Sequence, residues 1–385
     1  MLKEYKSPLL RNVYIATVYW GIVNIPLFII YTYFTIYLYN SGLEPAKIGL
    51  IFAIGSLANI IGYLVGGINT DLIGRRESML IGTILVGVSI YFLPTLSEFL
   101  SVLIVYFVYM TGFSLFFVSL NTLLGDSLTS ETYQKYSAIA YGVSKVPSIF
   151  AILVFILFLN KYSLGCLLKT TLQFSSFLVI ASTLFVLLIK DIYKIEKMER
   201  KIELDILFSK ERFLFIIFMS LIYFAFPMFW VMLSVFATSK AGLNLVEWGL
   251  IALVWFASYS PLQTLFSKIT NNISSRKGFI MSAIFFSING LTIVISPNML
   301  GFLLAIFFEV LAEAALWPIV FKVEMSLTES HYRGTYIGLV NIFGAIAMFF
   351  GNYVGGNLYS SIVVLPIIFA VIVFIIGTVC LATKY

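Results

Sequence analysis

Two glutamates and one lysine stand in stretches that are otherwise almost free of charge. Glu309 and Glu313 occur in FFEVLAEAALWP, and Lys145 occurs in AIAYGVSKVPSIFA. An i, i+4 spacing puts two carboxyl groups on one face of a helix. Two such groups at low dielectric resist joint ionisation, so at least one of them should keep a proton. This chemistry suits a proton carrier, and it also suits a binder of cationic substrates.

The elements that carry these residues are expected to be membrane-spanning helices. The chain is 61% hydrophobic and only 11% charged, whereas a soluble domain is nearer half apolar and a quarter charged. Runs of about 20 apolar residues are long enough to span a bilayer. Twelve such runs are predicted: 12–38, 46–68, 78–95, 99–124, 136–159, 166–190, 213–238, 246–267, 279–296, 299–321, 333–357 and 361–382.

These spans place the three charges near the middle of the membrane. Glu309 and Glu313 lie roughly 15 and 21 Å into their span, and Lys145 lies about 14 Å into its own. A charge at that depth costs about 2.5–3.5 kcal/mol and marks a functional site by default. We therefore expect Lys145 to pair with Glu309 or Glu313 until a proton or substrate breaks the pair. The alternative is a neutral or snorkelling lysine, with the glutamates satisfied by a neighbouring Asn or Tyr.

The distribution of Lys and Arg orients the spans. With the N-terminus in the cytoplasm, nineteen of these residues lie on the cytoplasmic side and four lie outside. This bias predicts a multi-pass protein of the cell membrane with both termini cytoplasmic. The lipid bilayer therefore accounts for the net charge of +6, and no nucleic-acid partner is expected. The polar segment 191–212 is read as a cytoplasmic linker, or alternatively as a helix lying along the membrane surface.

The sequence repeats itself with a period of about 200 residues. GLEPAKIGLI at 42–51 corresponds to GLNLVEWGLI at 242–251, and SLTSETY at 127–133 corresponds to SLTESHY at 326–332. We therefore predict two halves descended from one six-helix unit: residues 1–190 and residues 213–385. Parallel repeats of this kind enclose a substrate site near mid-membrane in secondary transporters.

A compact charged loop, GGINTDLIGRR at 66–76, separates the second and third spans, and its Gly74 is expected to permit a tight turn with positive φ. Its residues Gly67, Asp71, Gly74, Arg75 and Arg76 resemble the signature loop of the major facilitator superfamily, Gly-x-x-x-Asp-x-x-Gly-Arg-Arg. Together with the twelve spans and the repeat, this resemblance covers essentially the whole chain. It implies an all-α integral membrane protein of two pseudo-symmetric six-helix bundles, and a monomer.

The resemblance also implies a cytoplasmic latch between the halves. We expect Asp71 to face the start of the eleventh helix near Arg333. The alternative is a loop whose charges only orient the chain in the membrane. Polar and aromatic residues elsewhere are candidates for lining the cavity, although such residues are more often packing or interface anchors. These candidates are Asn24, Tyr31, Tyr33, Asn121, Tyr223 and Trp230. Pro26, Pro227 and Pro318 are expected to break their helices beside a cavity.

The sequence departs from the drug-exporting members of that family. The fourth span contains no Arg or Lys, and the fifth lacks their glycine-rich motif, because Phe150 and Ala151 replace a glycine pair. The direction of transport therefore stays open. The leading interpretation is a secondary active transporter that moves a small solute by alternating access, coupled to protons. An uncoupled facilitator and a non-transporting receptor on the same fold are the alternatives.

Other classes of protein are disfavoured by what the sequence lacks. It contains no Gly-x-x-x-x-Gly-Lys-Ser/Thr loop for driving a pump with ATP. A membrane-embedded enzyme would need clustered nucleophiles, bases or metal ligands. The chain has one His, and its two Cys residues, Cys166 and Cys380, are far apart in the sequence. We expect no catalytic residues, no metal and no cofactor.

Overall fold

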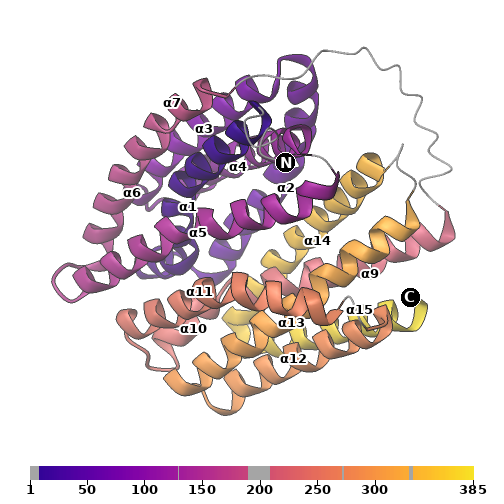
Figure 1. Ribbon diagram of the computed structural model, residues 1–385. Helices are drawn as coiled ribbons and strands as arrows, with labels where there is room; N and C mark the ends of the chain where they lie inside the picture. Colours follow the sequence, from indigo (N-terminus) through magenta and orange to yellow (C-terminus); the bar gives the residue numbers. More distant parts are fainter. Residues whose placement is uncertain (1–7, 129, 190–208, 271–272, 329–332) are drawn as a thin grey trace. The chain divides into compact units, whose positions relative to one another are not determined.

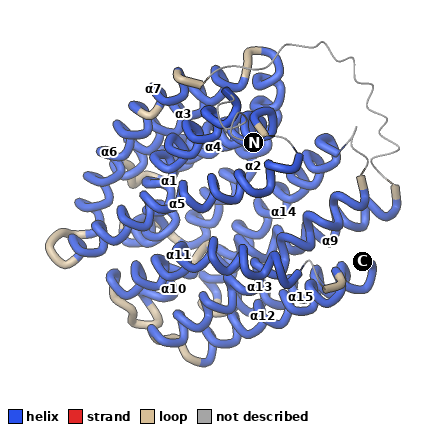
Figure 2. Tube along the Cα trace, viewed as in Figure 1, coloured by secondary structure: helices blue, strands red, loops and turns tan. Residues whose placement is uncertain are grey.

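The protein is built from helices. The computed structural model describes residues 8–128, 130–189, 209–270, 273–328 and 333–385, and in these ranges it contains helices and no strand (Figures 1 and 2). The all-α class predicted from the apolar runs is confirmed. A chain that crosses lipid must satisfy every backbone N–H and C=O internally, and a helix does so within one segment.

Within the described residues, the first half of the chain forms seven α-helices and one short 3-10 helix. Their bounds are α1 Pro8–Asn40, α2 Pro45–Leu72, α3 Arg75–Phe92, η2 Leu93–Thr95, α4 Phe99–Ser127, α5 Ser130–Leu159, α6 Leu164–Ala181 and α7 Thr183–Leu187. The predicted span 166–190 is thus interrupted at Ser182. The hydroxyl of Ser182 donates a hydrogen bond to the carbonyl of Val179 (2.6 Å).

The second half repeats this order. Its helices are α9 Lys210–Trp230, α10 Leu233–Ser239, α11 Leu245–Thr270, α12 Ser275–Ile295, α13 Met299–Leu327, α14 Arg333–Ser361 and α15 Leu365–Lys384. The predicted span 213–238 consists of α9 and α10, because the helix is interrupted between Trp230 and Leu233.

Twelve segments within the described residues are long and apolar enough to cross a membrane, which confirms the predicted number. Their outward faces are apolar as well. Leu157 of α5 is 71% exposed and Ile295 at the end of α12 is 72% exposed. Exposed apolar surface on this scale is not expected of a soluble monomer and fits contact with lipid.

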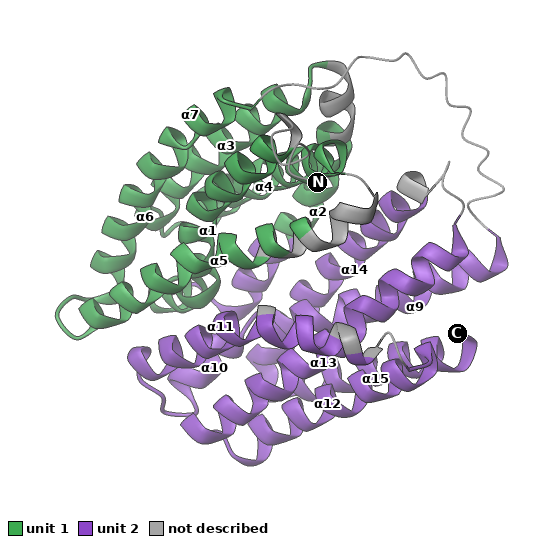
Figure 3. Cartoon of the chain, viewed as in Figure 1, with its two compact units in different colours: residues 1–41, 54–198 green, residues 42–53, 199–385 purple. Residues whose placement is uncertain are grey.

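The chain divides into two compact units (Figure 3). Unit 1 comprises residues 1–41 and 54–198, and unit 2 comprises residues 42–53 and 199–385. The first turns of α2 therefore belong to the second unit. A chain divided only at one linker would have these turns in the first unit. The predicted linker falls almost entirely outside the described residues, so its form stays a prediction.

The same helix pairs pack in both units. In unit 1, α3 packs along α4 and α6, and α1 packs along α5. In unit 2, α12 packs along α13 and α15, and α9 packs along α14. Each pair in one unit corresponds to a pair in the other under the 200-residue offset, so the packing follows the sequence repeat.

Glycines with a left-handed backbone mark corresponding turns. Gly42 has φ 88° and Gly242 has φ 76°, and each opens one copy of the repeated sequence. Gly74, in the charged loop, has φ 107° and caps the N-terminus of α3. Glycine adopts this conformation at no steric cost, so the turn expected at Gly74 is present.

Two of the three expected proline breaks do not occur. Pro26 lies inside the continuous helix α1, and Pro318 lies inside α13. Proline has a helical φ and removes one backbone hydrogen bond, so a helix supported by neighbours can continue through it. Only Pro227 lies close to an interruption, because α9 ends three residues later at Trp230.

Candidate functional site

The centre of unit 2 holds a buried carboxyl group. Glu309 of α13 has no exposed surface. Two tryptophan indoles donate hydrogen bonds to it: Nε1 of Trp230 to Oε1 (3.3 Å) and Nε1 of Trp255, on α11, to Oε2 (2.5 Å). Each carboxyl oxygen therefore has its own donor, which offsets part of the cost of burying a polar group.

The two indoles also pack on each other. The ring centroids of Trp230 and Trp255 are 5.3 Å apart with an interplanar angle of 49°. Trp255 further contacts Phe256 at 4.6 Å and Tyr259 at 6.0 Å. These contacts restrict the rotamers of both indoles, so they hold the donors in a fixed position around Glu309.

The interruption between α9 and α10 accounts for the position of Trp230. Pro227 has no N–H to donate back along α9, and the carbonyl of Pro227 accepts the bond from Val231 (2.8 Å) that ends the helix. Trp230 is thus the last residue of α9. A side chain at a helix end has more freedom to turn toward a neighbouring helix than one in the middle of a helix.

Glu313 and Tyr259 extend the site by one helical turn. Glu313 makes side-chain hydrogen bonds with Glu309 and with Tyr259, and both Glu313 and Tyr259 are half-buried. Carboxylates accept but do not donate, so a bond between two carboxyl groups requires one of them to carry a proton. The i, i+4 geometry predicted for the two glutamates is therefore present.

Lys145 lies in unit 1, on α5, and is half-buried. Beside it, Nδ2 of Asn24 donates to the carbonyl of Ser144 (3.2 Å) and to its hydroxyl (3.3 Å). Asn24 thus ties α1 to α5 next to the lysine. Each unit is described by itself, so the pairing of Lys145 with Glu309 or Glu313 stays a prediction.

The aromatic candidates fall into different environments. Tyr31 is 56% exposed. Tyr33, in contrast, is fully buried and stacks on Phe155 at 4.8 Å. Tyr31 therefore has the surface that a ligand contact needs, and Tyr33 has the surroundings of a packing residue.

The two remaining candidates lie in different units, Tyr223 in unit 2 and Asn121 in unit 1. Tyr223 packs against Trp317 with centroids 6.0 Å apart. Asn121 is a half-buried residue six positions before the end of α4.

The charged loop builds an ion pair that the sequence did not predict. Arg75 is 5% exposed and its Nε bonds Oδ2 of Asp126, near the end of α4, at 2.8 Å. Arg76 pairs with Glu77, also at 2.8 Å. The loop therefore fastens α3 to α4 within unit 1. The side chains of Gly67, Asp71 and Arg333 lie outside the described part of the structure, so the expected latch stays a prediction.

Sequence reasoning missed Trp255, Tyr259 and Asp126. Trp255 and Tyr259 stand four residues apart on α11, the spacing that already singled out the two glutamates. Asp126 is an acid within two residues of a span end. The spacing of Trp255 and Tyr259 and the position of Asp126 can both be read from the sequence. The residues that these side chains contact depend on which helices pack together.

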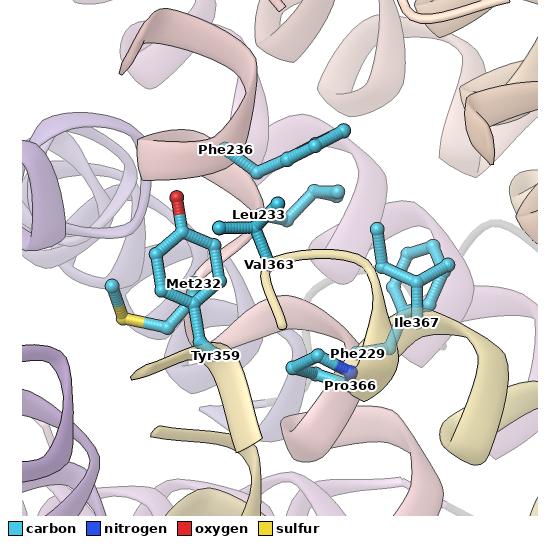
Figure 4. A pocket seen from close by; sticks show the side chains of 8 residues that line it. All are labelled: Phe229, Met232, Leu233, Phe236, Tyr359, Val363, Pro366 and Ile367. Carbon is cyan, nitrogen blue, oxygen red and sulfur yellow. The ribbon is translucent and has the colours of Figure 1, made fainter. Parts of the chain in front are cut away.

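The pockets within each unit do not coincide with this site. In unit 2, Figure 4 shows a narrow apolar crevice with Phe229, Met232 and Tyr359 among its walls. In unit 1, a cavity of about 350 Å³ is lined by residues such as Ile22, Leu178 and Phe185. None of the predicted site residues lines either space, and their apolar walls offer little to orient a polar solute. Among the described residues, no three His, Cys, Asp or Glu side chains gather as metal ligands.

Solved structures of transporters share this fold. The chain superimposes on a mutant of the nucleoside transporter NupG with a TM-score of 0.75, 12% identity and 98% of both chains covered. It matches a D-xylose-proton symporter with a TM-score of 0.75 at 13% identity, covering 98% of this chain and 97% of the other. It also matches an inward-facing, unoccupied bacterial homologue of the human lysosomal transporter Spinster, with a TM-score of 0.73, 12% identity and 98% of both chains covered. At such identities the likeness shows the fold alone.

The sequence itself identifies the family. No curated protein matches it. The family model described as "Major Facilitator Superfamily" matches residues 19–250 and again residues 214–385, which together include nearly the whole chain. The resemblance carried by the charged loop is thereby confirmed, and the chain belongs to the major facilitator superfamily.

Proposed function

We propose that this protein is a secondary active transporter that couples the movement of a small solute to protons by alternating access. Glu309 and Glu313 are the proton-coupling residues, and Lys145 is the cation that one of them meets during the cycle. The observation that carries the proposal is the fully buried carboxyl of Glu309, held by two indoles in the middle of a spanning helix. A titratable group at that depth is costly and marks ion pathways in transporters.

The setting supports the same proposal. The chain has the fold of transporters, among them a symporter that couples D-xylose to protons. A hydrogen bond between the carboxyl groups of Glu309 and Glu313 needs one proton, so such a pair can gain or lose charge without another ion. In the cell, the protein acts in the plasma membrane as a monomer with both termini in the cytoplasm.

The proposal is tested in proteoliposomes that enclose a pH-sensitive dye. Solutes are added outside one at a time: nucleosides, pentoses and hexoses, amino acids, and organic cations. We expect one class to move protons together with the solute, giving a dye response that protein-free vesicles lack. Tracer uptake of that solute then shows whether proton and solute move in the same or in opposite directions.

The double variant Glu309→Gln/Glu313→Gln tests the residues. Glutamine keeps the size and the acceptor oxygen but cannot exchange a proton, so we expect the solute-driven dye response to fall to the level of empty vesicles. Glu247→Gln is the matched control, because Glu247 is a half-buried acid in the first turn of α11, where its carboxyl accepts a bond from the backbone N–H of Asn244 (2.8 Å). A full proton response in the double variant contradicts the proposal, and tracer exchange without any proton response in the wild type indicates an uncoupled facilitator.

A further inference from the structure

Glu309 has no route of its own to water. Its side chain is fully buried, whereas Glu313, one turn along α13, is half-buried. Any proton that reaches or leaves Glu309 must therefore pass through a neighbouring group. Dividing the proton-coupling role between the two glutamates in this way rests on the proposed function.

The partners of Glu309 leave one path for its proton. Trp230 and Trp255 bond its two oxygens, but an indole is a donor only and cannot accept a proton from the carboxyl group. Glu313 is the one hydrogen-bonding partner described for Glu309 that can accept. The O–H of a protonated Glu309 consequently points toward Glu313.

We propose that Glu313 and Glu309 form a two-carboxyl proton relay in which Glu309 holds the proton, Glu313 exchanges it with water, and Trp230 and Trp255 are positioning residues. In the transfer step, the O–H bond of Glu313 breaks as the O–H bond of Glu309 forms. The carboxylate left on Glu313 then takes a proton from a hydronium ion in the solvent on the side to which the site is open, which leaves water. Release of the proton follows the same steps in reverse.

Burial and hydrogen bonding fix the direction of this assignment. A charge left on fully buried Glu309 costs more than a charge on half-buried Glu313, because burial removes more water from it. Tyr259 bonds Glu313 and, as a phenol, can donate to the carboxylate formed there. The neutral end of the relay is therefore inside, and the end that changes charge is the more accessible one.

Few other titratable groups in the described residues bear on Glu309. Those that act on it are Glu313 on the same helix and Tyr259 on α11. On the neighbouring helices α9 and α12, the charged residues occur only in the first turns. Glu324, the other buried acid described on α13, is fifteen residues along the helix from Glu309. A titration of the buried carboxyl thus reports on the relay.

Infrared difference spectroscopy of the full chain in lipid, recorded across a pH titration, tests the relay without any solute. A protonated buried carboxyl gives its own C=O stretch, separate from the amide bands. We expect this band in the wild type, its loss in Glu309→Gln, and its retention in Glu313→Gln. In the dye assay, Glu313→Gln should lose the solute-driven proton movement, because Glu313 is the one partner described for Glu309 that can accept its proton.

The positioning role has its own matched pair of variants. Trp255→Phe removes the 2.5 Å bond, so we expect the band to shift to higher frequency and the titration midpoint to move by about one pH unit. Trp317→Phe should leave both unchanged, because Trp317 packs on Tyr223 and Phe226 instead. If Glu309→Gln fails to fold, the comparison of Trp255→Phe with Trp317→Phe still tests whether the band comes from Glu309.

The relay is refuted if the band disappears in Glu313→Gln and persists in Glu309→Gln, or if Trp255→Phe leaves it unmoved. These results are independent of the proposed function. A chain that couples solute to protons but loses its band with Glu313 refutes the relay alone. A chain with the expected band but no solute-driven proton movement refutes the transport proposal alone.

Discussion

At the scale of single residues, two buried charged or titratable side chains are each held by specific hydrogen bonds. Glu309 is held by two indoles, and Arg75 is held by Asp126. Unpaired, either group would be strongly destabilising at its depth. The first set carries the proposed chemistry. The second fastens the loop that resembles the family signature.

The Arg75–Asp126 pair gives a prediction about stability. We expect Asp126→Asn to lower the free energy of unfolding of the protein by about 2–3 kcal/mol, because Arg75 is almost fully buried and would lose its charged partner. Glu77→Gln, which removes the half-exposed partner of Arg76, should cost less than about 1 kcal/mol. Unfolding in detergent measures both. Equal losses would show that Arg75 does not depend on Asp126.

At the scale of elements, close helix packing in unit 2 depends on glycines of α14. A Cβ atom at Gly351 would lie 2.2 Å from the carbonyl oxygen of Phe224 on α9, whereas a Cβ atom at Gly338 on the same helix would meet nothing within 4 Å. Small residues at such crossings let helix backbones approach in a membrane. The α9–α14 contact therefore brings the backbone of α9 close to α14 at Gly351.

These two glycines form a matched pair of variants. Gly351→Ala should destabilise the protein by about 1–3 kcal/mol, because α9 and α14 must move apart. Gly338→Ala should be neutral or stabilise by up to about 1 kcal/mol, because alanine has the better helix propensity and finds open space. Thermal unfolding of the purified protein compares them. A Gly351→Ala variant as stable as the wild type would contradict the described packing.

At the scale of the whole molecule, the distribution of Lys and Arg predicts which helix ends face the cytoplasm. The two cysteines test this directly, because Cys166 lies in the first turn of α6 and is exposed, whereas Cys380 lies near the end of α15. We expect a membrane-impermeant maleimide to label intact cells at Cys166 only. Cys166→Ser should abolish that labelling. Labelling that persists in Cys166→Ser cells would place the C-terminal end of α15 outside.

The sequence predicted those features that a single segment determines. The twelve spans, the turn at Gly74 and the shared face of Glu309 and Glu313 all follow from local composition and spacing. The partners of Glu309 did not follow, because Trp255 reaches it only through the packing of α11 on α13. The breaks expected at Pro26 and Pro318 were wrong, since neighbouring helices support the backbone there.

The most direct test of the central claim is solute accumulation driven by an imposed pH gradient. Proteoliposomes containing the wild type are diluted into buffer of a different pH, with the labelled solute found in the dye assay at equal concentration on both sides. We predict net movement of the solute against its own gradient, abolished by a proton ionophore and absent in Glu309→Gln/Glu313→Gln. Solute that only equilibrates, at the same rate with and without the pH gradient, would contradict proton coupling.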